Sequence, residues 1–366
     1  MTELQVRSEQ HGYSVLVGHG IVRQLGQRLT ALGMSGRVAV VTDDTVARYW
    51  REPVLSSLIA ERFVPEVFTL RPGEANKSLS AAEPLYGALI RAGFSRADPL
   101  IALGGGVVGD LAGFVAATYH RGMPLVQVPT TLLAQVDASI GGKVAVDHPL
   151  GKNLVGAFHP PRFVLVDVTM LGTLPSRERW TGLAEMVKHG LIADAGLLAD
   201  LDHHLEALGA GELDVETLES LVARSIRVKT EVVSVDEREQ GVRLHLNFGH
   251  TLGHALETVT GYGPLTHGEA IVIGMRAAVK ISERLGRLDA ASAAGALRLL
   301  ARFPAPPERI PPPTREALLA AISRDKKAVA GNVRFIVLDG LGRAAVVPSL
   351  PPDVIEAGID WVLAEL

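Results

Sequence analysis

The sequence contains no cysteine, and this absence limits the chemistry that the chain can perform. It excludes disulfides, thiolate metal ligands and a cysteine nucleophile, so a metal site would need histidine, carboxylate and water ligands. The sequence also has no apolar run of the ~18–20 residues that a membrane-spanning helix requires, and its first residues do not resemble a signal peptide. These absences predict a cytoplasmic protein without a membrane partner.

The chain has little excess charge of either sign, with a formal net charge of −4 over 366 residues. Such a balance provides no bulk attraction for nucleic acid, so we expect no nucleic-acid partner. A bound anion would have to be held by individually placed lysines and arginines. Apolar residues make up 47% of the chain, which is typical of a folded protein, and its length favours two domains.

The first half of the chain alternates short apolar runs with a helical pattern, most clearly at residues 80–92. The runs predict strands at residues 37–42, 63–70, 99–103, 124–128 and 163–166. This alternation favours a mainly parallel sheet that is buried on both faces. The later sequence predicts one strand at 334–338 and helices at 177–192, 213–233, 249–260, 267–285 and 315–322. We therefore expect an α/β, Rossmann-like domain over residues 1–170 and a mostly α-helical domain over residues 171–366.

A glycine-rich segment, Gly104-Gly105-Gly106-Val107-Val108-Gly109-Asp110, follows the third of these strands. It satisfies G-x-G-x-x-G, in which glycine lets the backbone approach a pyrophosphate at a helix N-terminus. A turn that only packs a helix on a strand would show the same pattern. No acidic residue stands ~20 positions further on, where a ribose partner is usual. Ribose partners could instead come from the ends of the earlier strands, at Asp43, Asp44, Glu74 or Lys77.

Two histidines four residues apart, His250 and His254, share one helix face. The residue after His250 is Thr251, so the general base of the zinc-protease motif is missing. His267 stands at the expected start of the next helix, and Glu185 lies in an apolar helical stretch, where a carboxylate without a partner would be costly. Each residue alone could be a satisfied polar group on a helix face. Together they favour a metal site, since catalytic zinc needs about three such ligands and an open position.

Several basic residues lie outside amphipathic helices. Lys143 follows two glycines and Lys152 follows one, in segments that we predict to be turns able to cradle an anion. The others are Arg121, Lys188, Lys229, Arg243 and Lys326. Each alone could be a solvated surface charge, but the set suggests a polyanionic substrate that carries a phosphate and a carboxylate.

Further motifs are spread over nearly the whole chain: Pro72-Gly73-Glu74-x-x-Lys77, Pro149-Leu150-Gly151-Lys152-Asn153, Glu185-Met186-Val187-Lys188, His267-Gly268-Glu269 and the segments 102–110, 127–133, 135–143, 246–254 and 325–327. Together they resemble the motifs of the 3-dehydroquinate synthase family. The departures are small: Val144, Asp147 and His189 stand where the family usually has Thr, Asn and Tyr. None of them falls on a position to which we assign a chemical role.

The resemblance implies a homodimeric cytoplasmic lyase of the shikimate pathway, which leads to the aromatic amino acids. It would convert 3-deoxy-D-arabino-heptulosonate 7-phosphate to 3-dehydroquinate and phosphate. The steps would be transient oxidation by NAD, β-elimination of phosphate, reduction and intramolecular aldol closure. Residues 1–170 would then bind NAD, and residues 171–366 would bind the metal and the substrate.

The resemblance also suggests roles for individual residues. One zinc or cobalt ion would be held by Glu185, His250 and His267. The NAD candidates are Asp43, Asp44, Glu74, Lys77, Gly105, Gly106, Val107, Asp110, Thr130, Thr131, Lys143 and Lys152. The substrate candidates are Arg121, Lys143, Lys152, Asn153, Lys229, Arg243, Asn247, His254 and Lys326, with Lys229 and Arg243 on the carboxylate and Arg121 reaching the neighbouring subunit's site. The catalytic candidates are Asp137, Lys143, Lys188 and His254.

Other functions fit part of this pattern. A metal-dependent polyol dehydrogenase would release NADH and would not need Lys143 and Lys152. A sister sugar-phosphate cyclase that makes a cyclitol would keep the NAD and metal motifs. Its substrate has no carboxylate, so the presence of both Lys229 and Arg243 argues against it. A non-catalytic binding module would not explain a metal constellation together with a nucleotide turn.

Overall fold

The computed structural model describes residues 1–306, 310, 313–323, 328–329 and 332–366. These residues form two compact units. The first contains Met1–Arg179 and Gly211–Glu237, and the second contains Trp180–Ala210 and Arg238–Leu366. The units therefore differ from the consecutive segments 1–170 and 171–366 expected from the sequence. The reason is helix α7 (Val215–Val235), which packs against the first strands of the chain and so belongs to the first unit.

A seven-stranded sheet forms the centre of the first unit, in the order β1-β2-β9-β6-β5-β3-β4. Its neighbouring strands are parallel except for the antiparallel pair β1–β2. The strands are β1 (Thr2–Val6), β2 (Tyr13–Gly18), β3 (Arg37–Asp43), β4 (Val64–Leu70), β5 (Leu100–Gly104), β6 (Leu125–Pro129) and β9 (Phe163–Asp167). The five predicted strands are confirmed to within one or two residues at each end. The β1–β2 hairpin was not predicted.

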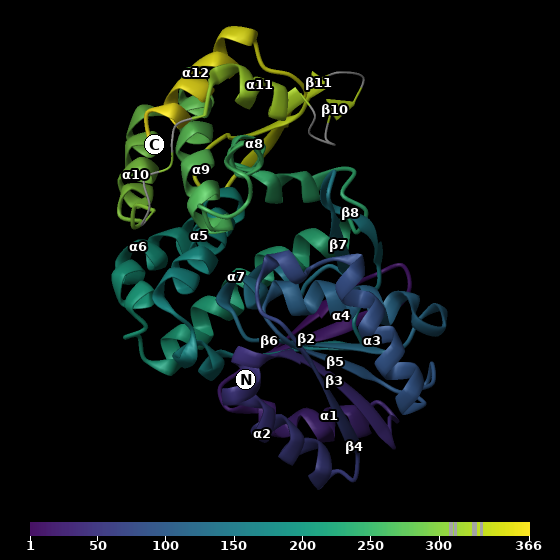
Figure 1. Ribbon diagram of the computed structural model, residues 1–366. Coiled ribbons are helices and arrows are strands. Elements are labelled where there is room, and N and C mark those ends of the chain that lie inside the picture. The colour runs from purple at the N-terminus through teal and green to yellow at the C-terminus, as the bar shows by residue number, and fades with distance from the viewer. Residues whose placement is uncertain (307–309, 311–312, 324–327, 330–331) are drawn as a thin grey trace. The chain divides into compact units, whose positions relative to one another are not determined.

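Helices cover both faces of this sheet, as expected for a buried parallel sheet (Figure 1). Alternate residues of β3 point to opposite faces, so that Val38 and Val40 join one core and Ala39 and Val41 join the other. The first core includes α1 (Leu25–Ala31) and α2 (Asp44–Ala60), and the second includes α3 (Leu79–Ala92) and α4 (Gly106–Thr118). Short helical turns are η1 (Ile21–Gln24), η2 (Glu74–Asn76), η3 (Tyr119–Arg121), η4 (Ala134–Ala138) and η5 (Val168–Thr173).

A separate hairpin, β7 (Lys143–His148) with β8 (Gly151–Phe158), corrects one prediction. Lys143 and Lys152 lie in these strands, so their prediction as turn residues was wrong. The turns lie directly before the strands instead, at Gly141 and Gly142, which both have positive φ, and at Pro149 and Leu150. The hairpin is held by a contact that no local pattern reveals: a Cβ on Gly113 of α4 would lie 2.3 Å from Val144 Cγ1.

The second unit is mostly helical, as expected. It contains most of α5 (Ser176–Ala193), followed by α6 (Ala195–Ala210), η6 (Val242–Asn247), α8 (His250–Thr260), α9 (His267–Arg284), α10 (Ala290–Ala301), α11 (Arg315–Ser323) and α12 (Pro352–Leu363). Its short hairpins pair β10 (Ala328–Val329) with β11 (Asn332–Val333), and β12 (Phe335–Leu338) with β13 (Ala344–Val347). The predicted helices at α5, α7, α8, α9 and α11 and the strand at β12 are confirmed, whereas α6, α10 and α12 were not predicted. The helices in the described residues are all too short or too polar to cross a membrane.

Candidate functional site

Three helices of the second unit approach one another unusually closely because glycines line their contacts. A Cβ on Gly268, in the first turn of α9, would lie 2.4 Å from Thr181 Cα of α5. A Cβ on Gly274 would lie 2.1 Å from the carbonyl oxygen of Gly249, directly before α8. Any larger residue at either position would push the helices apart. The first residues of α8 and α9 are thereby brought to the middle of α5.

The three candidate metal ligands meet at this point: Glu185 from α5, His250 from α8 and His267 from α9. The Nε2 atoms of the two histidines each lie 3.5 Å from Glu185 Oε1, longer than an ordinary N–H···O hydrogen bond. Two ligand atoms bound tetrahedrally to one zinc ion stand about 3.4 Å apart. Glu185 is fully buried, and its side chain and the imidazoles are the ligand types that zinc and cobalt accept. The cluster therefore fits one such ion.

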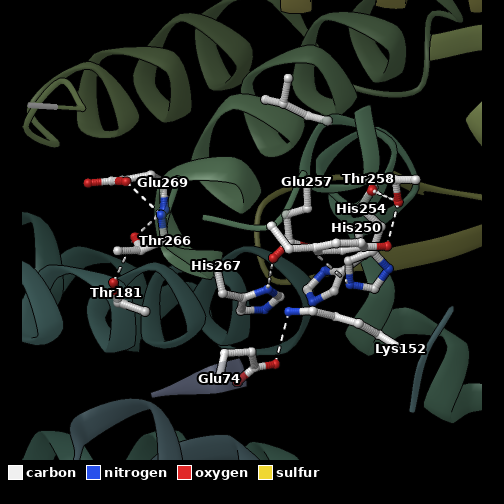
Figure 2. Close-up of polar contacts among 12 residues, drawn as sticks. Glu74, Lys152, Thr181, His250, His254, Glu257, Thr258, Thr266, His267 and Glu269 are labelled. Carbon is white, nitrogen blue, oxygen red and sulfur yellow. Dashed lines mark hydrogen bonds and ion pairs between the residues drawn. The ribbon is translucent and has the colours of Figure 1, made fainter. Parts of the chain in front are cut away.

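The other nitrogen of each imidazole also has a defined partner, and Figure 2 shows the one of His267, Glu257. His250 Nδ1 lies 3.1 Å from the carbonyl oxygen of Phe248, and His267 Nδ1 lies 3.3 Å from Glu257 Oε1. Carbonyl and carboxylate oxygens accept hydrogen bonds, so Nδ1 is the donor in both rings. Nε2 of each ring then faces Glu185, and once it is deprotonated its lone pair can ligate a metal ion at that side.

A lysine balances part of the negative charge in this cluster. Lys188, one turn further along α5 and 1% exposed, donates from Nζ to Glu185 Oε2 and leaves Oε1 facing the histidines. Burial alone would lower the pKa of His267, but the nearby carboxylates of Glu185 and Glu257 raise it from 6.5 to about 10. The two carboxylates thus create a negative potential at this imidazole, which favours a cation beside it.

The remaining candidates of the second unit surround this cluster or lie in η6. His254 is one turn after His250, and its Nε2 is 4.0 Å from Glu257 Oε2. Its side chain is 41% exposed, far more than that of His250. Arg243 is 2% exposed in η6, where Asn247 donates from Nδ2 to Glu239 Oε1 at 2.6 Å. Glu257 and Glu239 were not found from the sequence, although Glu257 stands seven residues after His250, on the same helix face.

In the first unit, the glycine-rich segment lies at a switch point of the sheet. From β3 the chain passes to β4 on one side and then to β5 and β6 on the other, and ligands commonly bind where the strand order diverges in this way. A Cβ would lie 2.6 Å from Val108 if added to Gly104, and 2.9 Å from Gln127 Oε1 if added to Gly109. The nearest contact for Gly106 is an ordinary 3.4 Å from Ala138 Cβ. Gly104 and Gly109 thus serve packing, while Gly106 leaves space at the start of α4.

The other candidates for NAD at this edge follow the ends of β3 and β6. Asp43 caps α2, and its Oδ1 accepts the backbone N–H groups of Thr45 at 2.8 Å and Val46 at 2.9 Å. Asp44 follows it and is exposed. The N–H of Thr130 donates to the carbonyl of Gly104, and a Cβ on Gly105 would lie 2.9 Å from Thr131 Cγ2. Both threonines therefore border the glycine segment, with Val107 in the first turn of α4.

Two ion pairs link the loop before α3, the start of α4 and the β7–β8 hairpin. Lys77 Nζ, which is buried, lies 2.5 Å from Asp110 Oδ2 and 2.6 Å from Asn153 Oδ1. Lys152 Nζ lies 2.9 Å from Glu74 Oε1. Burial raises the pKa of Asp110 from 3.8 to about 6, even though Lys77 acts in the opposite direction. Five candidates distant in sequence are thus brought together.

A third pair joins two candidates to which different roles were assigned. Lys229 of α7, which is 6% exposed, donates from Nζ to the backbone oxygen of Asp137 at 2.6 Å and to Asp137 Oδ1 at 2.5 Å.

Lys143 is exposed at the start of β7. Arg121 is exposed in η3, where it and His120 both have positive φ, a costly backbone for non-glycine residues. Lys326 lies outside the described residues.

Known proteins match this chain over nearly its full length. Residues 67–181 match the family model described as 3-dehydroquinate synthase N-terminal, and residues 182–328 match the C-terminal one. A 3-dehydroquinate synthase from Pelobacter propionicus is 45% identical over 348 residues, which covers 95% of this chain and 96% of that protein. One from Azotobacter vinelandii is 44% identical over 363 residues, covering 98% of this chain and 97% of that protein.

Solved structures show the same similarity. A 2-deoxy-scyllo-inosose synthase complexed with carbaglucose-6-phosphate, NAD+ and Co2+ has a TM-score of 0.87 and 27% identity, and 98% of this chain and 99% of that chain are covered. A 2-epi-5-epi-valiolone synthase from Streptomyces hygroscopicus with NAD+ and Zn2+ has a TM-score of 0.86 and 28% identity, covering 100% and 99%. A glycerol dehydrogenase from Schizosaccharomyces pombe, at 0.67 and 15% identity over 96% and 89%, shares the fold.

Proposed function

The chain belongs to the 3-dehydroquinate synthase family, and we propose that it catalyses the reaction for which that family is named. It would convert 3-deoxy-D-arabino-heptulosonate 7-phosphate to 3-dehydroquinate and phosphate, as a carbon–oxygen lyase of the shikimate pathway. The observation that carries the proposal is the 44–45% identity to curated 3-dehydroquinate synthases over 95–98% of the chain.

Glu185, His250 and His267 would hold one zinc or cobalt ion. Their 3.5 Å separations and the Nδ1 partners of both histidines support this role. When bound, the ion would lower the pKa of a substrate hydroxyl, and NAD would accept a hydride and later return it. Lys188 would hold Glu185 in place and help to position the ring hydroxyls, together with Asp137.

NAD would bind at the switch point of the sheet in the first unit. The free N–H groups at the start of α4, in the segment Gly105, Gly106 and Val107, would receive the pyrophosphate. The remaining contacts would come from Asp43, Asp44, Glu74, Lys77, Asp110, Thr130, Thr131, Lys143 and Lys152. The packing of Gly106 supports this proposal, because it leaves room where a pyrophosphate would approach the backbone.

The substrate would be held mainly by charge. The phosphate would be bound by Lys143, Lys152, Asn153, Asn247, His254 and Lys326, and His254 or the departing phosphate would accept the proton lost in the elimination. Lys229 and Arg243 would bind the carboxylate, for which Lys229 would exchange its bond to Asp137. Arg121 would serve the site of a neighbouring subunit, and its costly backbone conformation supports a functional role. The homodimer and the cytoplasmic location stay predictions.

The alternative functions are less well supported. The glycerol dehydrogenase is only 15% identical, so its similarity extends to the fold alone. The cyclases that carry other names are 27–28% identical, well below the 44–45% of the named 3-dehydroquinate synthases.

An assay with the purified protein tests the proposal directly. The protein, NAD, a divalent metal and the heptulosonate phosphate are mixed, and the release of phosphate and the formation of 3-dehydroquinate are followed. We expect both products in equal amounts, with NAD needed in catalytic quantity and with activity lost on chelation. Stoichiometric accumulation of NADH would instead identify a dehydrogenase.

Replacement of one metal ligand tests the assignment of the site. His250→Ala removes one of three ligands, so we expect at least a ~100-fold loss of metal affinity and of kcat. Circular dichroism should show that the variant is still folded, because the histidine lies at the first residue of α8. Retained activity would show that His250 is not a ligand of the metal ion. His203→Ala, on an exposed residue of α6, serves as the control and should change neither quantity.

A further inference from the structure

We propose that Glu257 is a positioning residue for the metal site, acting through His267 rather than binding the ion itself. This inference rests on the proposed metal site of Glu185, His250 and His267. It adds a residue that lies outside the motifs quoted from the sequence.

Glu257 lies on the same face of α8 as the two histidines of that helix, three residues after His254 and seven after His250. It is only 8% exposed, although it is a carboxylate. Its two oxygens face two different imidazoles: Oε1 lies 3.3 Å from His267 Nδ1, and Oε2 lies 4.0 Å from His254 Nε2 (Figure 2). A buried carboxylate is costly unless charged or donor groups compensate it, so this arrangement favours a function for it.

The two histidine ligands are oriented by unlike acceptors. His250 donates to the backbone carbonyl of Phe248, which is fixed by the turn at Gly249 (φ 77°). His267 donates to the Glu257 side chain instead. The side chain of His267 is 29% exposed, against 9% for His250, so the surrounding protein holds it less firmly. The orientation of His267 therefore depends more on its hydrogen bond, and a carboxylate acceptor also increases the basicity of the imidazole.

A second arrangement uses Glu257 as a ligand, because the ligand atoms of His254, Glu257 and His267 also lie within 4.8 Å of one another. The two arrangements require different faces of His267. Ligation beside Glu257 would use Nδ1, whereas ligation beside Glu185 uses Nε2. The geometry favours Nε2, since Nε2 of both His250 and His267 lies 3.5 Å from the same fully buried Glu185 oxygen. Glu257 then accepts the hydrogen bond from Nδ1.

The test measures metal binding directly and does not depend on turnover. The full-length protein is freed of metal with a chelator and titrated with Co2+, whose visible absorption reports the ligand set, in competition with a chromophoric chelator. We expect Glu257→Ala to weaken Co2+ binding by about 10- to 100-fold, the usual effect of losing such a partner. The absorption bands should keep their shape, because the ligands are unchanged. Glu257→Gln retains an acceptor oxygen without the charge, so its Co2+ affinity should lie between those of the wild type and Glu257→Ala.

Matched controls and outcomes separate this inference from the proposed function. Glu283→Gln removes a carboxylate from the exposed last turn of α9 and should leave Co2+ affinity unchanged. Unchanged affinity in Glu257→Ala would overturn the positioning role alone. A changed Co2+ spectrum in Glu257→Gln would show that Glu257 is a ligand. Failure of the wild-type protein to bind Co2+ would overturn the metal site itself. If Glu257→Ala does not fold, the comparison of Glu257→Gln with wild type decides.

Discussion

The two units build their candidate sites in different ways. In the first unit the ends of neighbouring parallel strands and the start of α4 provide backbone groups, and the hydrogen bonding of the sheet sets their spacing. In the second unit side chains from α5, α8 and α9 converge, and close helix contacts set their spacing. Glycine contributes to both, but at Gly106 it leaves the space proposed for a ligand, whereas at Gly274 it leaves room for another helix. The same residue type therefore has a different role in each unit.

The largest expected effect is on the helix contact of the second unit. A Cβ in Gly274→Ala would lie 2.1 Å from the carbonyl oxygen of Gly249, so α8 and α9 must separate. We expect the free energy of unfolding to fall by about 1–3 kcal/mol. We also expect weaker metal binding. Urea denaturation and Co2+ titration measure both.

Gly295→Ala is the matched control for this change. Gly295 lies in α10, and the nearest atom to its Cβ would be 3.7 Å away, so helix propensity should give equal or slightly greater stability. A similar loss in both variants would show that the contact of Gly274 is not what sets the spacing of the ligands.

An intermediate effect is expected in the first unit, on binding rather than on stability. In Gly106→Ala the new methyl group is tolerated, since its nearest neighbour lies at 3.4 Å. It would occupy the space proposed for the pyrophosphate, so we expect NAD affinity to fall by about tenfold, which corresponds to about 1.4 kcal/mol. Calorimetric titration with NAD measures the affinity, and thermal denaturation should show a nearly unchanged midpoint. Normal NAD affinity would place the cofactor away from Gly106.

A separate effect, which is seen only when the pH is changed, concerns the stability contributed by the Lys77–Asp110 pair. The pKa of Asp110 is raised from 3.8 to about 6, so the folded state keeps a proton that the unfolded chain loses. Stability from this group is present below about pH 4 and is lost as the pH rises to about 6. Asp110→Asn cannot titrate, so the wild type should lose up to about 1.4 kcal/mol per pH unit relative to it within this window. Urea denaturation of both proteins at several pH values measures this difference. If the free energy of unfolding of the two proteins changes with pH in the same way, the raised pKa of Asp110 is contradicted.

Local patterns were sufficient for much of the fold. The predicted strand of residues 37–42 is confirmed, and the capping of α2 by Asp43 also follows a short-range rule. The turns predicted at Lys143 and Lys152 were wrong, because the β7–β8 hairpin is stabilised by the surface of α4, which no neighbouring residue indicates. The position of α7 in the first unit has the same explanation: its apolar face indicates that it must be covered, but not by which strands.

The sequence by itself determined which residues share a helix face or follow a strand, because a helix repeats every 3.6 residues and a turn follows its strand directly. It thus placed His250 beside His254 and the glycines directly after β5. Tertiary structure alone decided which of these groups meet. Glu185 reaches His250 and His267, and Lys77 reaches Asp110, across long stretches of chain. Such contacts depend on which surfaces pack together. Helical periodicity is a local property, whereas the packing of glycines and apolar faces is decided only when the whole chain folds.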